Sequence, residues 1–272
     1  MAQALGQMRI GFIGGGNMAE ALIRGLLAAG AAPANLLVAE LLDSRREQLR
    51  QRYGVQALTQ SGALLEQAEI IVLAVKPQAA EAALAPISDL FEPHHCLISI
   101  LAGVSTARLE KLLGGTPRVI RVMPNTPALI GAGAAGISRG RNATDADEQR
   151  ACALFRSVGQ VQVVKEALLD AVTGLSGSGP AYAYLLIEAM ADGGVLEGLP
   201  RDVALQLAAQ TVAGAAQMVL QEGEHPALLR DRVCSPAGTT IAALRCLEAA
   251  GLRSAVIEAV ACAAQRSREL AG

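Results

Sequence analysis

Aromatic residues and charged residues are both scarce in this sequence. The chain of 272 residues has no Trp, three Phe and three Tyr, so its core must be built from aliphatic side chains and alanine. Only 18% of the residues are charged and the formal net charge is −2, which gives no basic surface for nucleic acid or for an anionic membrane. Hydrophobic residues make up 52% of the chain, which excludes a disordered protein.

Cysteine and histidine are also few, and neither type shows the spacing of a disulfide framework or a metal site. The cysteines are odd in number and never form C-x-x-C, so we expect reduced thiols at Cys96, Cys152, Cys234, Cys246 and Cys262. No secretory signal peptide is recognisable, and the expected location is the cytoplasm. A metal is not expected, because the three histidines lack ligand spacing.

One long run without charge, residues 203–221, has to be weighed as a membrane span. Four glutamines recur in it at spacings that place them on one helical face, namely Gln206, Gln210, Gln217 and Gln221. The run therefore predicts an amphipathic helix of a soluble protein rather than a membrane-spanning segment.

The first 165 residues alternate apolar runs with segments of helical length. We expect strands at 9–13, 36–39, 69–75, 96–101 and 118–122, with more peripheral ones at 136–140 and 161–164. Apolar strands separated by helices predict a parallel sheet covered on both faces, which is the doubly wound α/β fold of Rossmann type. Only helical patterns follow, so the expected domains are 1–165, which binds a dinucleotide, and 166–272, which is all-α.

The first expected strand leads into a glycine-rich turn, with Gly14, Gly16 and Ala19 in the pattern G-x-G-x-x-A. The first glycine permits the tight turn, the second lets a pyrophosphate approach the backbone, and the small third residue lets the helix pack on the strand. The phosphates would lie against unpaired N–H groups at the start of the helix. Since the turn follows the first strand of an α/β domain, it predicts dinucleotide binding rather than a purely structural turn.

Residues after the second strand bear on which dinucleotide is bound. Glu40 stands where an acid hydrogen-bonds the ribose 2′-hydroxyl and favours NAD. Arg45, with Ser44 and Arg46, has the chemistry to hold the 2′-phosphate of NADP, although both arginines also fit the solvated first turn of the next helix. Lys76, at the end of a later strand, either contacts the cofactor or lies in solvent.

The helical half offers no obvious general acid. It contains no lysine and one histidine, His225, whereas most nicotinamide enzymes that act on alcohols or carbonyls use His, Lys or Tyr. A hydroxyacid dehydrogenase with a catalytic lysine in this domain is therefore disfavoured, and Tyr182 and Tyr184 fit core positions better. A substrate with a C=N bond removes the difficulty, because a protonated imine is already electrophilic and mainly needs alignment with the cofactor.

Across its length the chain resembles the pyrroline-5-carboxylate reductase family. The matching stretches run in order: "IGFIGGGNMAEALI" (10–23), "LAVKP" (73–77), "RVMPNTPALIGAG" (121–133), "GLSGSGPAY" (174–182), "IEAMADGGV" (187–195) and "VCSPAGTTIAAL" (233–244). The resemblance implies an enzyme of proline biosynthesis that reduces 1-pyrroline-5-carboxylate to L-proline, with NADPH as the expected reductant and NADH as the alternative. The alternative function is another NAD(P)-dependent imine or β-hydroxyacid oxidoreductase of similar fold.

The resemblance also implies how the chain assembles. Members dimerise by interleaving their C-terminal helical domains, so we expect a homodimer, and further a decamer of five dimers. The partners would then be the small-molecule substrate and other copies of the chain, without nucleic acid or membrane.

Site residues follow from the resemblance and from the motifs above. The expected cofactor set is Gly14, Gly15, Gly16, Asn17, Met18, Glu40, Arg45, Ser61, Ala74, Val75, Lys76, Pro77, Ala102, Gly103, Pro124 and Asn125. The expected substrate set is Ser235, Ala237, Gly238, Thr239 and Thr240. In this set backbone N–H groups would hold the substrate carboxylate, and Thr240 would be the catalytic residue, hydrogen-bonded to the ring nitrogen.

The local sequence of "CSPAGTT" (234–240) suits this role. Pro236 and Gly238 favour a turn, and Thr239 or Thr240 is expected to cap the helix that follows, leaving N–H groups for an anion. The same features would also serve a turn that only caps a helix.

Two positions depart from the pattern usual in the family. Ala237 stands where members often have glycine, which is tolerated without strain only where the backbone needs no positive φ. Ser61 stands where members often carry Asn, and this leaves recognition of a 2′-phosphate open.

Overall fold

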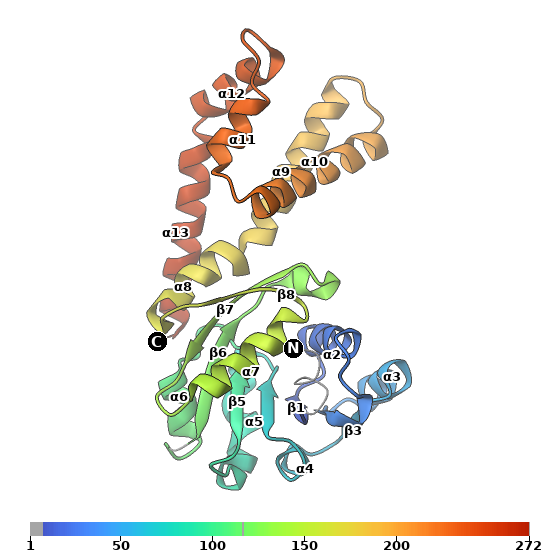
Figure 1. Cartoon of the computed structure of the whole chain (residues 1–272), viewed down its shortest axis with the longest axis vertical. Coiled ribbons are helices and arrows are strands. Elements are labelled where there is room, and N and C mark those ends of the chain that lie inside the picture. The colour runs from blue at the N-terminus through green and yellow to red at the C-terminus, as the bar shows by residue number, and fades with distance from the viewer. Residues whose placement is uncertain (1–7, 116, 272) are drawn as a thin grey trace. The chain divides into compact units, whose positions relative to one another are not determined.

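The computed structural model describes residues 8–115 and 117–271 (Figure 1). Its contacts divide the chain into two compact units, one of Met1–Gly177 with Ala263–Gly272 and one of Ser178–Cys262. The first is an α/β unit and the second is helical, as the sequence predicts.

Within the described residues, eight strands of the first unit form one sheet in the order β3-β2-β1-β4-β5-β6-β7-β8. They are β1 (Ile10–Ile13), β2 (Leu36–Ala39), β3 (Gln56–Leu58), β4 (Ile70–Leu73), β5 (Cys96–Ser99), β6 (Arg118–Met123), β7 (Gly133–Arg139) and β8 (Gly159–Val163). The first six have the Rossmann order 3-2-1-4-5-6. Neighbouring strands are parallel except for β6 and β7. The sequence did not predict β3, whose three residues are too few to show a pattern.

Helices cover both faces of the sheet, because the strand side chains point alternately into two cores. Ile10 and Phe12 belong to one core, which includes residues of α2 and α7, while Ile13 and Leu73 belong to the other, with residues of α4 and α6. The α-helices of this unit that precede the second unit are α2 (Asn17–Ala28), α3 (Asp43–Tyr53), α4 (Gly62–Leu65), α5 (Ala80–Leu84), α6 (Thr106–Leu112), α7 (Asp145–Arg156) and α8 (Leu169–Val172).

The helical unit is built on a pair of long helices with small residues between them. Its helices are α9 (Gly179–Leu196), α10 (Arg201–Glu222), α11 (Pro226–Arg232), α12 (Thr239–Ala249) and the first part of α13 (Leu252–Ala271). Ala191, Ala204 and Ala208 form the small buried core between α9 and α10. A Cβ at Gly194 would lie 3.1 Å from the Cβ of Ala204, so the glycine allows the two helices to approach closely.

The contact division falls later in the chain than the predicted boundary at residue 165. Hydrogen bonds tie the segment after this point to the first unit: Thr106 donates to Glu166, and the Asn125 amide donates to the carbonyl of Ser176. Ser267 donates to Asp170 at 2.6 Å, which places the end of α13 in the first unit as well. Side-chain contacts between distant segments, which a one-dimensional pattern does not contain, set this division.

Helix α10 contains the uncharged run weighed above. It is long and apolar enough to cross a membrane by length and composition, with a mean hydropathy of 1.4 over its best window. Only 11% of that window is buried in the isolated chain. The helix therefore presents apolar surface that the chain itself does not cover.

Candidate active site

The glycine-rich turn has the geometry that a dinucleotide loop requires. Gly14 has a φ of +94° and donates to the carbonyl of Ala39 at 2.8 Å, and a Cβ there would lie 2.8 Å from the carbonyl oxygen of Ala74. Gly16 is the exposed N-cap of α2, with nothing within 4 Å of a Cβ, so a ligand can approach its backbone. The first N–H groups of α2, starting at Asn17, lack carbonyl partners one turn back and point to an anion.

A cavity of about 620 Å³ opens beside this turn, between the carboxyl ends of β1, β2 and β4; we call it the nucleotide cavity. Gly14, Glu40, Ser61 and Val75, all predicted, line it. In a Rossmann sheet, ligands bind at this switch point in strand order. The sequence analysis did not predict the opposite wall of this cavity. That wall comes from the segment after β4 and consists of Ala79, Ala82, Ala83, Pro86, Ile87 and Leu90. Its only signal in the sequence is a run of small residues.

Glu40 is held in place at the edge of the nucleotide cavity. One carboxylate oxygen accepts from the N–H of Gly15 at 2.8 Å and the other from the N–H of Leu42 at 3.0 Å. These bonds join the end of β2 to the dinucleotide loop.

Arg45 and Arg46 do not line this cavity. Arg45 donates to the carbonyl of Gly15 and to Glu20, each at 2.6 Å, and Arg46 pairs with Asp43 and donates to the carbonyl of Leu41 at 2.9 Å. Burial raises the pKa of Glu20, but hydrogen bonds from Tyr53 and Arg45 outweigh it and leave the pKa below its usual value. Glu20 therefore stays charged and holds Arg45.

The remaining cofactor candidates lie at the same edge of the sheet, after β4, β5 and β6. Ala74 and Val75 are half-buried, whereas the Lys76 side chain is exposed and does not line the nucleotide cavity, in keeping with the solvent alternative. Gly103 has a φ of +72° in the turn between β5 and α6 that also contains Ala102. The other candidates of the set, Met18, Pro77 and Pro124, are half-buried or buried.

Asn125 has a structural role that the sequence did not show. Its amide nitrogen donates to the carbonyl of Ser176 at 3.0 Å, and its amide oxygen accepts from the N–H of Ala134 at 2.8 Å. The side chain thus bridges three segments of the first unit, which fixes the turn after β6.

The substrate candidates lie together in the helical unit, in the turn before α12. Ala237 has a φ of +56°, and it is the one residue other than glycine with a positive φ among the described residues. The position does need a positive φ, so alanine replaces the family's glycine at the cost of backbone strain. A Cβ at Gly238 would lie 2.2 Å from the hydroxyl oxygen of Ser235, so a larger residue there would require the Ser235 side chain to rotate away.

The predicted cap on α12 was wrong. Thr239 and Thr240 are the first two residues of the helix, Gly238 is its N-cap, and no side chain caps it. A bond from the N–H of Gly238 to the carbonyl of Ser235, at 3.0 Å, closes the turn instead. Without a side-chain cap, the N–H groups of Thr239, Thr240 and Ile241 have no acceptor within the described chain and are free for an anion.

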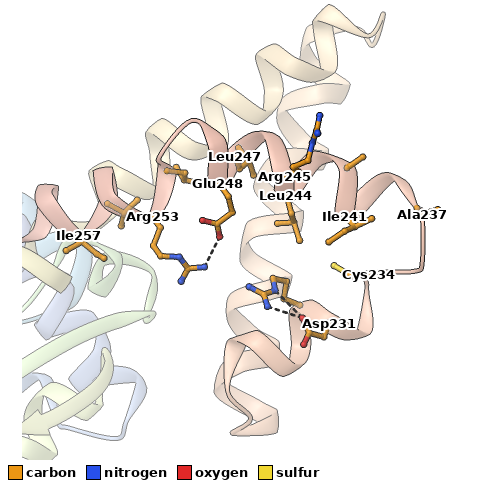
Figure 2. A pocket seen from close by; sticks show the side chains of 15 residues that line it. Asp231, Cys234, Ala237, Ile241, Leu244, Arg245, Leu247, Glu248, Arg253 and Ile257 are labelled. Atoms are coloured by element: carbon orange, nitrogen blue, oxygen red, sulfur yellow. Dashed lines mark hydrogen bonds and ion pairs between the residues drawn. The ribbon is translucent and has the colours of Figure 1, made fainter.

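A larger groove, of about 1000 Å³, lies elsewhere in the helical unit, between α11, α12 and the start of α13. Figure 2 shows the side chains of Ile241 and Leu244 directed into it, with an ion pair between Arg253 and Glu248 nearby. Ala237 and Gly238 reach its edge, but Thr240 does not line it. This α11–α13 groove is mostly apolar, which suits a protein surface better than a small anion.

Among residues 8–115 and 117–271, no three His, Cys, Asp or Glu side chains are grouped so as to hold a metal ion. His225 caps α11 by accepting from the N–H of Ala227 at 3.2 Å. The Tyr182 hydroxyl donates to the carbonyl of Ala259 at 3.3 Å.

Comparison with known proteins covers both units. Residues 166–270 match the family model for pyrroline-5-carboxylate reductase dimerisation, and residues 9–103 match the model for NADP oxidoreductase, coenzyme F420-dependent. The pyrroline-5-carboxylate reductase of Synechocystis is 47% identical over 97% of this chain and 98% of its own length. That of Methanosarcina acetivorans is 45% identical over 96% and 97%.

Solved structures agree over the whole length. A pyrroline-5-carboxylate reductase from Coxiella burnetii superposes with a TM-score of 0.93 at 35% identity, covering 97% of this chain and 99% of that one. The Plasmodium falciparum enzyme, solved with NADP bound, gives 0.87 at 31% identity, covering 98% and 99%. With relatives this similar over nearly all of both chains, the protein belongs to the pyrroline-5-carboxylate reductase family.

Proposed function

We propose that this chain reduces the C=N bond of 1-pyrroline-5-carboxylate to give L-proline, using a reduced nicotinamide dinucleotide. The observation that supports the proposal is a pair of local geometries: a glycine turn with positive φ at Gly14 in the first unit, and an uncapped helix start at Thr239 in the second. When bound, the dinucleotide supplies the hydride that adds to the imine carbon.

The chain's own residues bind and orient the two reactants. The segment from Gly16 to Met18, at the start of α2, offers N–H groups to the pyrophosphate, and the nucleotide cavity offers space for the adenosine end. At the start of α12, free N–H groups receive the substrate carboxylate, each hydrogen bond to a charged group contributing about 1.5–3 kcal/mol. Two or three such bonds suffice for a small anion without an arginine.

Thr240 is the residue we assign to the ring nitrogen. Its side chain is half-buried at the second position of α12, whereas Ser235 and Thr239 are exposed. A protonated imine needs no general acid for hydride addition, and His225 and Tyr182 already have hydrogen-bond partners in the chain. Alignment of the substrate is therefore the main contribution of this turn to the rate.

The assembly we propose is a homodimer formed through the helical unit, with five dimers in a decamer. Apolar side chains such as Leu185, Leu220 and Ile257 are more than half exposed in the isolated chain, and the family model that covers this region is one for dimerisation. A second copy would cover α10 and the α11–α13 groove without a membrane. We also propose a cytoplasmic location, which suits five cysteines that are all unpaired.

The test is oxidation of NADH and NADPH by the purified protein with 1-pyrroline-5-carboxylate, followed by absorbance and by detection of proline. Turnover with at least one dinucleotide is expected. Absence of turnover with both would refute the assignment. Oxidation of NADH or NADPH only by another imine, or reduction of NAD⁺ or NADP⁺ by a β-hydroxyacid, would establish the alternative function.

Thr240→Val tests the residue assignment. Loss of one hydrogen bond to the reacting ring should lower kcat by roughly tenfold or more, while the dissociation constants of NADH and NADPH stay unchanged. Thr240→Ser keeps the hydroxyl and serves as the control, with a rate near that of the parent. A Thr240→Val enzyme with full kcat would remove Thr240 from the mechanism.

A further inference from the structure

The nucleotide cavity places one charged side chain near the adenosine end of a dinucleotide. Of the residues that line it, Glu40 alone carries a charge; Ser61 and Thr59 are neutral, and most of the others are apolar. No lysine or arginine lines it within the described residues. Glu40 therefore provides the one charged side chain that lines this cavity among the described residues.

That carboxylate cannot easily turn away. It accepts from the N–H groups of Gly15 and Leu42, one on each oxygen, and Glu40 directly follows β2. A Cβ added at Gly15 would lie 3.2 Å from the same carboxylate, so the acid packs directly against the dinucleotide loop. At the end of the second Rossmann strand, an acid accepts from the ribose 2′-hydroxyl, and a phosphate on that oxygen would meet its charge.

The two arginines next to this site, Arg45 and Arg46, are already held by partners within the chain. All three guanidinium nitrogens of Arg45 donate within the chain, to Gly15, Glu20 and Gln48, each at 2.6 Å. Arg46 is bound to backbone carbonyls and to Asp43, and only 12% of its side chain is exposed. Freeing either arginine for a 2′-phosphate would break these bonds.

Resting on the function proposed above, we propose that Glu40 makes this enzyme prefer NADH over NADPH. This reverses the expectation of NADPH drawn from the family resemblance. The NADP held by the 31% identical Plasmodium enzyme does not decide the preference here, because the proposal concerns Glu40 and the engaged arginines of this chain.

Calorimetric titration of the full-length protein tests the proposal without catalysis, with 5′-AMP and 2′,5′-ADP as the probes, which differ only in the 2′-phosphate. 5′-AMP should bind about tenfold or more tightly than 2′,5′-ADP, because like charges in contact are strongly unfavourable. Glu40→Gln keeps the size of the side chain and removes its charge. It should bring the ratio of the two dissociation constants closer to one, by roughly the same factor.

Glu47→Gln is the matched control. Glu47 lies on α3, pairs with Arg50 at 2.8 Å and does not line the nucleotide cavity, so the same change in net charge should leave the ratio unaltered. NADH and NADPH, titrated in the same way, should show the same order of affinity.

The outcomes separate this proposal from the function. Equal or tighter binding of 2′,5′-ADP by the parent protein, or an unchanged ratio in Glu40→Gln, overturns the role of Glu40 even where 1-pyrroline-5-carboxylate is reduced. The expected ratio without any reduction of that substrate overturns the proposed function alone. Failure to bind either nucleotide overturns both, and the parent protein's ratio decides the matter should Glu40→Gln not fold.

Discussion

At the scale of single residues, Ala237 adopts a backbone conformation that is unfavourable for alanine, in the turn where we propose that the substrate binds. A left-handed conformation costs an L-residue about 1–2 kcal/mol, yet the turn requires it at this position. Strain of this kind tends to persist at functional sites, where the surrounding structure fixes the backbone.

Replacing Ala237 with glycine should therefore not destabilise the protein. Relief of strain offsets the extra entropy of glycine in the unfolded chain, so the free energy of unfolding should stay level or rise by up to about 1 kcal/mol. Ala243→Gly, in the exposed middle of α12, should instead lose about 1 kcal/mol. Urea unfolding measures both, and equal losses would show that position 237 is unstrained.

His95 is a second residue whose environment makes a prediction, here about pH. Its Nε2 lies 2.8 Å from the carbonyl oxygen of Leu65 and its Nδ1 accepts from the N–H of Glu92 at 2.9 Å, which requires the neutral ring. Burial lowers the pKa of His95 below 6.5, although the bond to Leu65 opposes this. Below about pH 6.5 the unfolded chain then binds more protons than the folded one, so stability falls as the pH falls.

The measurement is the urea midpoint at about pH 7.5 and about pH 5.5. His95→Asn should lose less stability between these values than the parent, because the titrating group is gone. His225→Asn, at the exposed histidine that caps α11 in the helical unit, should behave like the parent. A parent midpoint that rises on acidification would contradict the assignment.

At the scale of elements, Glu166 anchors the start of α6. Its carboxylate accepts from the N–H of Thr106 at 2.7 Å and from the Thr106 hydroxyl at 2.6 Å, and it pairs with buried Arg121 on β6 at 3.3 Å. A negative charge at a helix N-terminus is favourable, and here it also fixes the turn with Ala102 and Gly103 that precedes α6. One side chain thus connects a strand, a helix and the segment that leads towards the helical unit.

Glu166→Gln should destabilise the first unit by roughly 2 kcal/mol, because charge-assisted hydrogen bonds are lost and Arg121 is left without a buried counter-charge. The urea midpoint of that unit, followed by circular dichroism, should fall accordingly. Glu47→Gln breaks only an exposed pair and should change stability by about 0.5 kcal/mol or less. Similar effects of the two changes would mean that Glu166 is not an anchor.

At the scale of the whole molecule, the helical unit buries too little of its own apolar surface. Among its residues, the buried core comprises three alanines, while leucines and isoleucines on α9 to α13 are exposed. Large exposed apolar patches mark interaction surfaces. We therefore expect another copy of the chain to cover this surface, in keeping with the dimerisation family model that matches residues 166–270.

Light scattering should accordingly give a mass that is a multiple of 27.9 kDa. Ile257→Asp, which puts a charge into the α11–α13 groove, should shift the protein towards the monomer mass. Ser254→Asp adds the same charge on α13 outside the groove and should leave the mass unchanged. A monomeric parent protein would contradict the proposed dimer, and a mass of two chains would exclude the decamer.

The sequence by itself determined the order of the strands other than β3, the Rossmann class of the first unit and the dinucleotide loop. These follow from local patterns: apolar runs such as Ile10–Ile13, the spacing of Gly14 and Gly16, and helical periodicity after residue 166. The break before α12, where we propose that the substrate binds, was also predicted from its helix-breaking residues. Sequence patterns predict the structure correctly where the conformation of a segment depends mainly on its own residues.

Only the tertiary structure decided which side chains are available to a ligand and which are held by partners within the chain. It showed that Ala237 needs a positive φ, that no threonine caps α12, and that Arg45 is held by Glu20 while Glu40 lines the nucleotide cavity. It also showed Glu166 reaching Thr106 across sixty positions of sequence. Each of these findings depends on which hydrogen-bond partners the fold brings together from distant segments. The spacing of residues along the sequence does not show which partners will meet.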